Sequence, residues 1–165
     1  MSSLKQDIDL AKTKTLLYSI REGALVPEIK VANAKVIRVD LFQKNIDNLP
    51  IYYPNATTSI LNFLVANIQN RPIVIGANFP YQPISNLGHT YPTKTAVKAF
   101  LELKDQKAYV ASYFGENTNI FIRNVFLGYY IGHEKQDLLM PIIIFEGDDG
   151  FFAYVSAVTD EWISN

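Results

Sequence analysis

The C-terminal third of the chain constrains the fold more than any other part. Residues 90–104, TYPTKTAVKAFLELK, carry apolar side chains at helical spacing, and Thr93 is the candidate N-cap. Four apolar runs follow this segment. We therefore expect a helix laid across an antiparallel sheet. Its packing face is predicted to consist of Val97, Phe100, Leu101 and Leu103.

The four apolar runs are predicted to be strands, at residues 107–114, 120–132, 138–147 and 151–158. Asp149-Gly150 lies between the last two and is typical of a hairpin turn, so Gly150 is expected to have a positive φ. Gly128 lies in the middle of the longest run and predicts a bend there.

The N-terminal half gives a mixed pattern. A ragged apolar stripe over residues 7–22, followed by Gly23, predicts a helix. Residues 35–44 alternate as in a half-buried strand, and residues 51–54 suggest a short extended piece. Residues 57–66 fit a strand or a short helix, of which we prefer the strand, and the β-branched run over 71–79 predicts another strand.

These elements predict an α+β protein with helices packed on an antiparallel sheet. A helix with about three strands would form residues 1–80, and a helix with about four strands would form residues 81–165. These two helix-plus-meander halves are expected to pack as one compact unit, and the sequence leaves open whether they arose by duplication.

Composition excludes several classes of function. The chain has 165 residues and 48% hydrophobic content, enough for a buried core. Its 15 Lys and Arg nearly balance 16 Asp and Glu, which argues against a nucleic-acid partner. The absence of Cys excludes disulfides and thiolate chemistry. No stretch approaches the roughly 18 apolar residues that span a bilayer.

Catalytic motifs are equally scarce. His89 and His133 have no partner at metal-ligand spacing, so neither a metal nor a cofactor is expected. Glu146, Asp148 and Asp149 form one acidic cluster, which the predicted turn explains. Phosphate-binding glycine loops and a nucleophile elbow are missing from the sequence. We expect no enzyme, and a hydrolase using Glu146 or Asp148 with a histidine ranks third among the hypotheses.

Aromatic residues are the remaining resource, with ten Tyr, ten Phe and one Trp. At many interfaces tyrosine buries its ring while its hydroxyl remains solvated, although in strands tyrosine more often packs in the core or against a neighbouring strand. The candidate binding residues lie near predicted loops or strand ends: Tyr52, Tyr53, Tyr81, Tyr91, Tyr129 and Tyr130.

The C-terminal strands also carry a family resemblance. The segments 127–130 (LGYY), 139–141 (LMP), 145–147 (FEG) and 153–158 (AYVSAV) resemble uncharacterised membrane-tethered bacterial proteins. These are similar in turn to YycI-type and PepSY-type extracytoplasmic regulatory domains. The resemblance implies an N-terminal anchor, expected upstream of Met1, and regulation through protein contacts.

Two functions follow as hypotheses. The first is a non-catalytic extracytoplasmic interaction or sensory domain on the cell-surface or periplasmic side, whose partner is another protein, including one held in a membrane. The second is a small-ligand binder with an apolar, aromatic-lined pocket. Contact with the membrane is expected only through the anchor, and a cytoplasmic location is the alternative.

Overall fold

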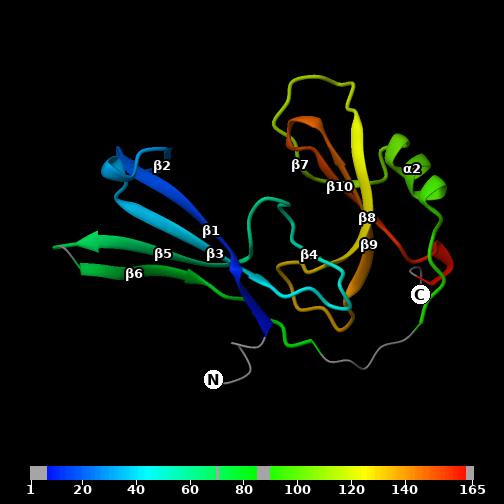
Figure 1. The fold of residues 1–165 in the computed structure, drawn as a ribbon, viewed down its shortest axis with the longest axis horizontal. Coiled ribbons are helices and arrows are strands. Elements are labelled where there is room, and N and C mark those ends of the chain that lie inside the picture. The colour runs from blue at the N-terminus through cyan, green and yellow to red at the C-terminus, as the bar shows by residue number, and fades with distance from the viewer. Residues whose placement is uncertain (1–6, 70, 85–89, 163–165) are drawn as a thin grey trace. The chain divides into compact units, whose positions relative to one another are not determined.

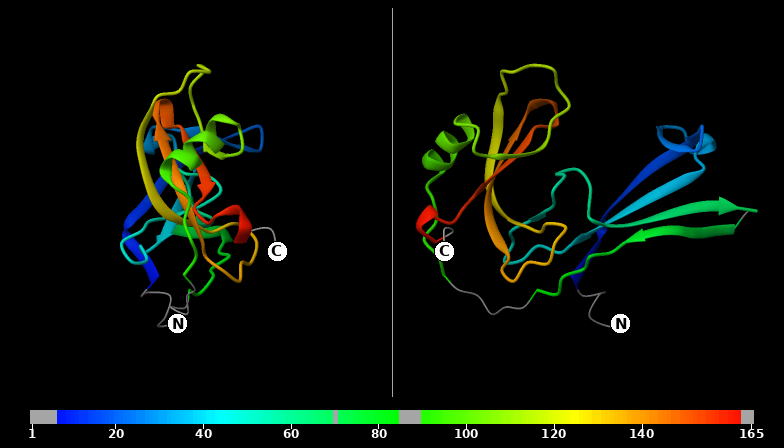
Figure 2. Two further views of the ribbon diagram at one scale, coloured as in Figure 1. Left: turned by 90° about the vertical axis from the view of Figure 1, so that its right-hand side faces the viewer. Right: turned by 180° about the vertical axis from the view of Figure 1, so that it is seen from behind.

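The computed structural model describes residues 7–69, 71–84 and 90–162, and within these ranges it consists mainly of β-strands (Figure 1). The chain forms two compact units. The first comprises Met1–Lys44 and Thr58–Tyr81, and the second comprises Asn45–Thr57 and Gln82–Asn165. Each unit contains one five-stranded sheet, and the two are called here the first and second sheet (Figure 2).

The first sheet has the strand order β2-β1-β3-β5-β6, and all its neighbours are antiparallel. Its elements are β1 (Ile8–Arg21), β2 (Ala24–Glu28), the 3₁₀ turn η1 (Val31–Asn33), β3 (Val36–Gln43), β5 (Leu61–Ile68) and β6 (Arg71–Asn78).

The second sheet has the order β4-β8-β9-β10-β7, in which only the pair β4 and β8 is parallel. Its strands are β4 (Ile51–Tyr52), β7 (Tyr109–Ser112), β8 (Ile122–Tyr130), β9 (Met140–Gly147) and β10 (Phe152–Ser156). The unit also contains the helix α2 (Ala96–Lys104) and the 3₁₀ turns η2 (Asp148–Gly150) and η3 (Asp160–Trp162).

The predicted α+β class is wrong, because the structure is built on two sheets and not on helices packed against one. The clearest error is the helix expected over residues 7–22, which is strand β1. Glu22 and Gly23 both have positive φ, 51° and 81°, and Arg21 pairs with Ala24. These two residues therefore form a tight hairpin turn, and Gly23 reverses a strand instead of ending a helix.

Most predicted strands are confirmed, including the preferred strand in 57–66, which begins at Leu61. The irregularity in β8 lies between Ile122 and Asn124 and not at Gly128. Gly128 instead allows close packing. A Cβ built there would lie 2.8 Å from the Pro50 carbonyl oxygen, which accepts a hydrogen bond from the Tyr129 N–H at the same distance.

Helix α2 is present, but its cap and its packing face differ from the prediction. Thr95 is the N-cap, and its hydroxyl accepts a hydrogen bond from the Lys98 N–H. Ala99 is fully buried and Leu103 packs against the same core. The rest of the predicted face is largely exposed, with Val97 at 71%, Phe100 at 43% and Leu101 at 53%. The small Ala99 side chain allows the helix backbone to approach the sheet closely.

This orientation gives a testable expectation for Phe100. Its ring is 43% exposed, and its centroid lies 6.2 Å from that of the buried Phe145. Phe100→Ala should lower the free energy of unfolding by about 1 kcal/mol, well below the roughly 3–5 kcal/mol typical of a buried ring. Chemical denaturation measures the difference. A loss of 3 kcal/mol or more, on the order of a core truncation, would mean that this face docks after all.

The core of the second unit lies on both faces of its sheet. On the α2 side, Ala99 and Phe151 pack with alternate residues of β9 and β10, which are Ile143, Phe145, Ala153 and Val155. On the opposite side, the intervening residues pack with Ala111, and these are Ile142, Ile144 and Tyr154. Central strands of this sheet are therefore apolar on both faces, which explains their continuous apolar runs.

Candidate functional site

The first sheet is apolar on both faces. Residues paired across neighbouring strands share a face, and adjacent rows lie on opposite faces. One row contains Leu17, Ile37, Val65 and Val74, and the next contains Tyr18, Val36, Ala66 and Ile73. The longest helical element among the described residues of this unit is the three-residue turn η1, so these residues supply no layer of helices to cover either face.

Large apolar side chains on this sheet are exposed. Ile20 is 54% exposed and Leu25, which pairs with it, is 43% exposed. Strand β6 exposes Ile73, Val74 and Ile75 by 43%, 59% and 50%. Ile20, Leu25 and Ile73 share the face of Tyr18, and Val74 lies on the opposite face. We call Ile20, Leu25 and Ile73 the first-sheet surface. Single exposed apolar residues are ordinary, whereas several on one face of a sheet mark a surface that contacts another molecule.

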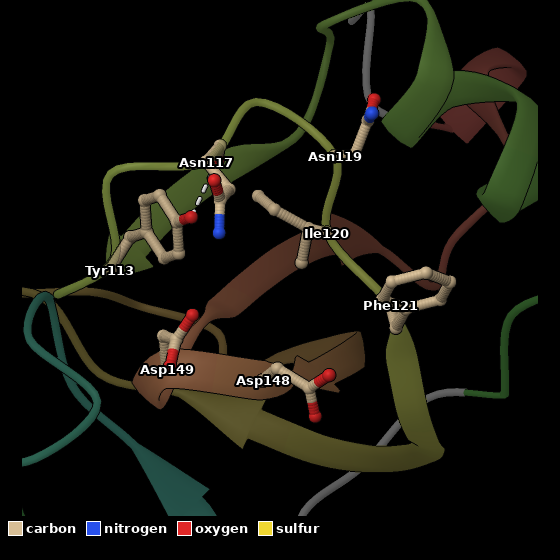
Figure 3. Close-up of a pocket in the computed structure, with 7 residues that line it drawn as sticks. All are labelled: Tyr113, Asn117, Asn119, Ile120, Phe121, Asp148 and Asp149. Carbon is tan, nitrogen blue, oxygen red and sulfur yellow. Dashed lines mark hydrogen bonds between the residues drawn. The ribbon is translucent and has the colours of Figure 1, made fainter.

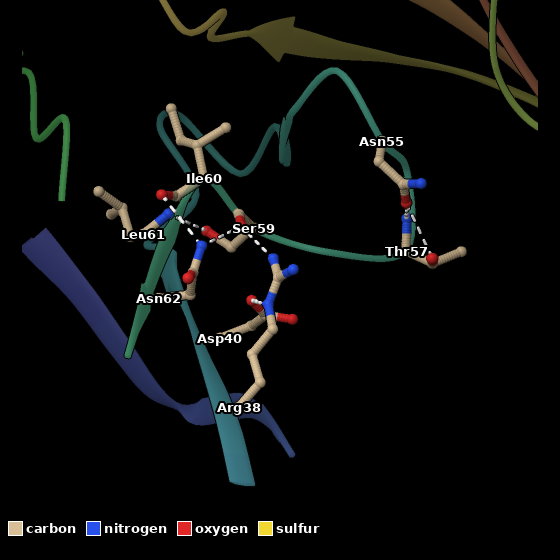
Figure 4. A network of polar contacts seen from close by, with 8 residues as sticks. All are labelled: Arg38, Asp40, Asn55, Thr57, Ser59, Ile60, Leu61 and Asn62. Atoms are coloured by element: carbon tan, nitrogen blue, oxygen red, sulfur yellow. Dashed lines mark hydrogen bonds and ion pairs between the residues drawn. The ribbon is translucent and has the colours of Figure 1, made fainter. Parts of the chain in front are cut away.

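One polar network interrupts the apolar face of Tyr18 (Figure 4). Asp40 on β3 is fully buried, and its Oδ1 accepts a hydrogen bond of 2.9 Å from Arg38 Nε. Arg38 Nη2 donates to the Ser59 carbonyl at 3.0 Å. Burial raises the pKa of the Asp40 carboxyl, and the Arg38 guanidinium and Lys14 oppose this shift. The network fixes the chain at the start of β5.

An aromatic cluster covers one face of the second sheet. It consists of Tyr52, Tyr109, Tyr130, Tyr154, Phe126 and Phe152, with neighbouring ring centroids 5.6–6.4 Å apart. The phenylalanines and the tyrosines at 130 and 154 occupy alternate positions on β8 and β10. Alternation along the strands thus gathers rings that are up to 102 positions apart in the sequence, from Tyr52 to Tyr154.

Two hydroxyl groups of the cluster form hydrogen bonds with backbone carbonyls. Tyr154 donates a hydrogen bond to the Tyr53 carbonyl at 3.3 Å, and Tyr109 donates to the Pro54 carbonyl at 2.9 Å. Burial raises the pKa of Tyr154, of Tyr52 and of Tyr130, so these phenols stay neutral at physiological pH. The cluster therefore holds residues 53–54 on the sheet and provides no charge for a ligand.

The structure brings together only two of the six tyrosines predicted to bind, Tyr52 and Tyr130. Tyr53 is buried at 2% exposure, and Tyr129 pairs with Ile51 and Pro141. Tyr91 lies edge-on to Trp162. The prediction missed Tyr109 and Tyr154, because alternation gives the face of each residue within its own strand but not which strands are neighbours. A binding role for these tyrosines stays a prediction.

Tyr81, the sixth of them, lies in the first unit. Its ring stacks on that of Phe79, and its hydroxyl donates to the Asp7 carboxylate. Burial, together with the hydrogen bond and negative charge of Asp7, raises the pKa of Tyr81 to about 12. Tyr81 therefore ties the end of the segment after β6 to the start of β1.

A pocket of about 170 Å³ lies beside the turn η2 (Figure 3). It is lined by Tyr113, Asn117, Asn119, Ile120, Phe121, Asp148 and Asp149. The Tyr113 hydroxyl donates to the Asn117 carbonyl at 2.5 Å and closes one side of it. This volume is below the roughly 300 Å³ at which small-molecule sites begin.

The turn beside this pocket has the predicted geometry. Asp149 and Gly150 have φ of 53° and 68°, and the Phe151 N–H donates to the Asp148 carbonyl. The positive φ expected for Gly150 is thus confirmed. The turn also accounts for the presence of Asp149, since aspartate is one of the residues favoured at positions of positive φ in a hairpin turn.

The two carboxylates proposed as catalytic groups, Asp148 and Glu146, accept hydrogen bonds from other side chains. Arg123 donates two hydrogen bonds of 2.6 Å to Asp148, and the bond and charge of Arg123 lower the pKa of that carboxyl. Glu146 accepts from Asn124 at 2.9 Å. His133 is exposed in the loop after β8, and His89 lies outside the described residues. Within the described ranges, no three His, Asp or Glu side chains come together as a metal site.

No helix in the described part of the chain is long and apolar enough to cross a membrane. No protein-family model, curated protein or solved structure matches the chain.

Proposed function

We propose that the chain is a non-catalytic extracytoplasmic domain that acts through contacts with another protein. The observation that carries the proposal is the first sheet, where two adjacent rows on opposite faces are apolar across four strands. Ile73 and Val74, at the β6 end of these rows, are exposed. An antiparallel sheet that faces water on one side normally alternates apolar and polar residues. This sheet does not, which favours a partner on the first-sheet surface.

The chemistry of the surface indicates the kind of partner. Its three residues are all aliphatic, and Ile20 and Ile73 are β-branched, the shape that packs on a pleated surface. An aliphatic or aromatic side of a folded protein fits them better than a charged ligand does. The resemblance of residues 127–158 supports an extracytoplasmic location and a regulatory role, with a partner held in or near the membrane.

The side-chain pairing also supports a role without catalysis. Asp148 is paired with Arg123 and Glu146 with Asn124. A general acid at neutral pH requires a raised pKa, whereas the hydrogen bond and charge of Arg123 lower the pKa of Asp148. These contacts disfavour the hydrolase hypothesis.

Site-specific photocrosslinking in the organism that encodes the chain tests the proposal. A photoreactive phenylalanine derivative is placed at Ile20 or Leu25, and at the exposed Lys107 of the second unit as the control. The two first-sheet positions should give covalent adducts with the same protein, and Lys107 should not.

The adduct is then reproduced with purified proteins. Ile20→Asp should weaken binding of the purified partner by about tenfold or more, since a buried, unpaired carboxylate is costly. The proposal fails if the first-sheet positions give no heterologous adduct, if Lys107 gives the same one, or if Ile20→Asp binds as tightly as the wild type.

A further inference from the structure

Strand β6 forms a long open edge of the first sheet. It pairs with β5 on one side, and in the sheet order no described strand lies on its other side. The strand has eight residues, and Arg71 is its only charged one. Seven of the eight are exposed. An edge of this kind presents unpaired N–H and C=O groups that can accept another strand.

The other three edges are shorter, and two carry further protection. At the opposite end of the same sheet, β2 has five residues and contains Pro27 and Glu28. The edges of the second sheet are β4, with two residues, and β7, with four residues and a register shift against β10. Short strands, prolines, charges and bulges all discourage edge pairing. Strand β6 also contains Pro72 and a bulge beside Val74, but it is the longest of the four edges, and Ile73, Val74 and Ile75 are exposed.

Pro72 indicates which backbone groups point outward. It has no N–H, and a proline within a paired strand is tolerated where its nitrogen faces away from the neighbour. Backbone groups alternate in direction along a strand, so the N–H and C=O of Val74 face the open side as well. Val74 therefore offers one donor and one acceptor at the middle of the edge.

We propose that β6 pairs antiparallel with β6 of a second copy of this chain, across a twofold axis at Val74. The two Val74 residues would exchange both N–H···O hydrogen bonds, which places their Cα atoms about 5.5 Å apart. A twofold contact of this kind uses the same strand on both copies and closes on itself. The result is one continuous ten-stranded sheet.

Charge and shape make this strand complementary to itself. With Val74 on the axis, Arg71 lies opposite Ala77 of the other copy. The two Arg71 side chains are then six residues apart along the strands, about 20 Å, well beyond the roughly 8 Å over which charges act at physiological salt. Ile73 of each copy lies opposite Ile75 of the other copy, and pairs of β-branched residues on neighbouring strands stabilise a sheet.

The inference is independent of the proposed function. Edge pairing uses the backbone of β6, whereas the partner contact proposed above is tested at Ile20 and Leu25 on β1 and β2. Self-association is measured on the purified chain with no partner present, so either proposal can fail without the other.

Sedimentation velocity of the full chain over a hundredfold range of concentration should show a reversible species of twice 18.7 kDa. Val74→Lys should weaken the association by about tenfold or more, because it places two like charges directly opposite each other. Val31→Lys is the matched control, since Val31 is 74% exposed in η1, away from the edge, and should leave the association unchanged. A chain that stays monomeric, or a dimer that Val74→Lys leaves intact, overturns the proposal.

A second experiment does not depend on the stability of the lysine variant. Because the chain has no cysteine, Val74→Cys introduces the only thiol. Cα atoms about 5.5 Å apart suit a disulfide, so mild oxidation should give a covalent dimer. Val31→Cys should stay monomeric under the same conditions. Failure of Val74→Cys to crosslink, or equal crosslinking of both variants, contradicts the twofold pairing at Val74.

Discussion

Replacing Gly128 with alanine is expected to lower the free energy of unfolding by about 3 kcal/mol, the upper end of the usual cost of overpacking. The added Cβ would lie 2.6 Å from Ile144 Cδ1 and 2.8 Å from the Pro50 carbonyl oxygen. The isoleucine methyl can rotate away. The carbonyl cannot move freely, because it accepts the hydrogen bond from the Tyr129 N–H that holds β4 beside β8. Urea denaturation monitored by circular dichroism measures the loss.

Gly132→Ala is the matched control. Its Cβ would have contacts of 3.4 Å or more, the closest being the ring of Tyr130. This substitution should change the stability by less than about 0.5 kcal/mol. If both variants unfold at the same denaturant concentration, close packing of β4 on β8 is not what requires a glycine at position 128.

Arg38→Met is expected to lower the free energy of unfolding by about 3 kcal/mol at neutral pH, because it removes the cation that is hydrogen-bonded to the buried Asp40 carboxylate. The methionine keeps much of the length of the arginine side chain, so the loss reports mainly the ion pair and the bond to the Ser59 carbonyl. Arg123→Met is the control. It breaks an exposed pair with Asp148 and should have little effect.

The cost of Arg38→Met should depend on pH. Burial raises the folded-state pKa of Asp40 above the ordinary aspartate value of 3.8, so the folded protein binds the proton more tightly than the unfolded chain does. The contribution of this group to stability is therefore complete below that value and is lost as the pH rises through the folded pKa. Loss of Arg38 should raise the pKa further.

The destabilisation by Arg38→Met should accordingly be largest at neutral pH and shrink toward pH values near and below 3.8, where Asp40 is neutral in both proteins. Denaturation of the wild type and the variant over a pH series measures it. A cost that does not change with pH would show that Asp40 is not ionised when Arg38 is present.

The C-terminal strands could be predicted because their signals are local. The apolar runs of β9 and β10 are short and flank Asp149-Gly150, and that pair of residues alone favours a hairpin. Helix α2 was predicted for the same reason, but its rotation was not. Large apolar residues at 97, 100 and 101 suggested the packing face, whereas the sheet contacts the small Ala99.

Strand β1 was missed because it contributes apolar residues to both faces of the first sheet. Leu16 and Leu17 point to opposite sides of the sheet, so the alternation expected of a half-buried strand is lost and the stripe resembles a helical one. The aromatic cluster depends on register between distant strands, including the parallel pairing of Ile51 with Tyr129. Local periodicity contains no information on such pairings, so Tyr109 and Tyr154 were not predicted beside Tyr52.

The short strand β4 has a consequence for the order of events during synthesis. Ile51 and Tyr52 pair with Tyr129 and Tyr130, which leave the ribosome 78 residues later. Contacts so distant in sequence slow folding, since a long loop must close before they form. Strand β4 therefore has no partner strand until β8 has been synthesised. A nascent chain stalled before Tyr129 should expose residues 45–57 to proteases that the finished protein resists.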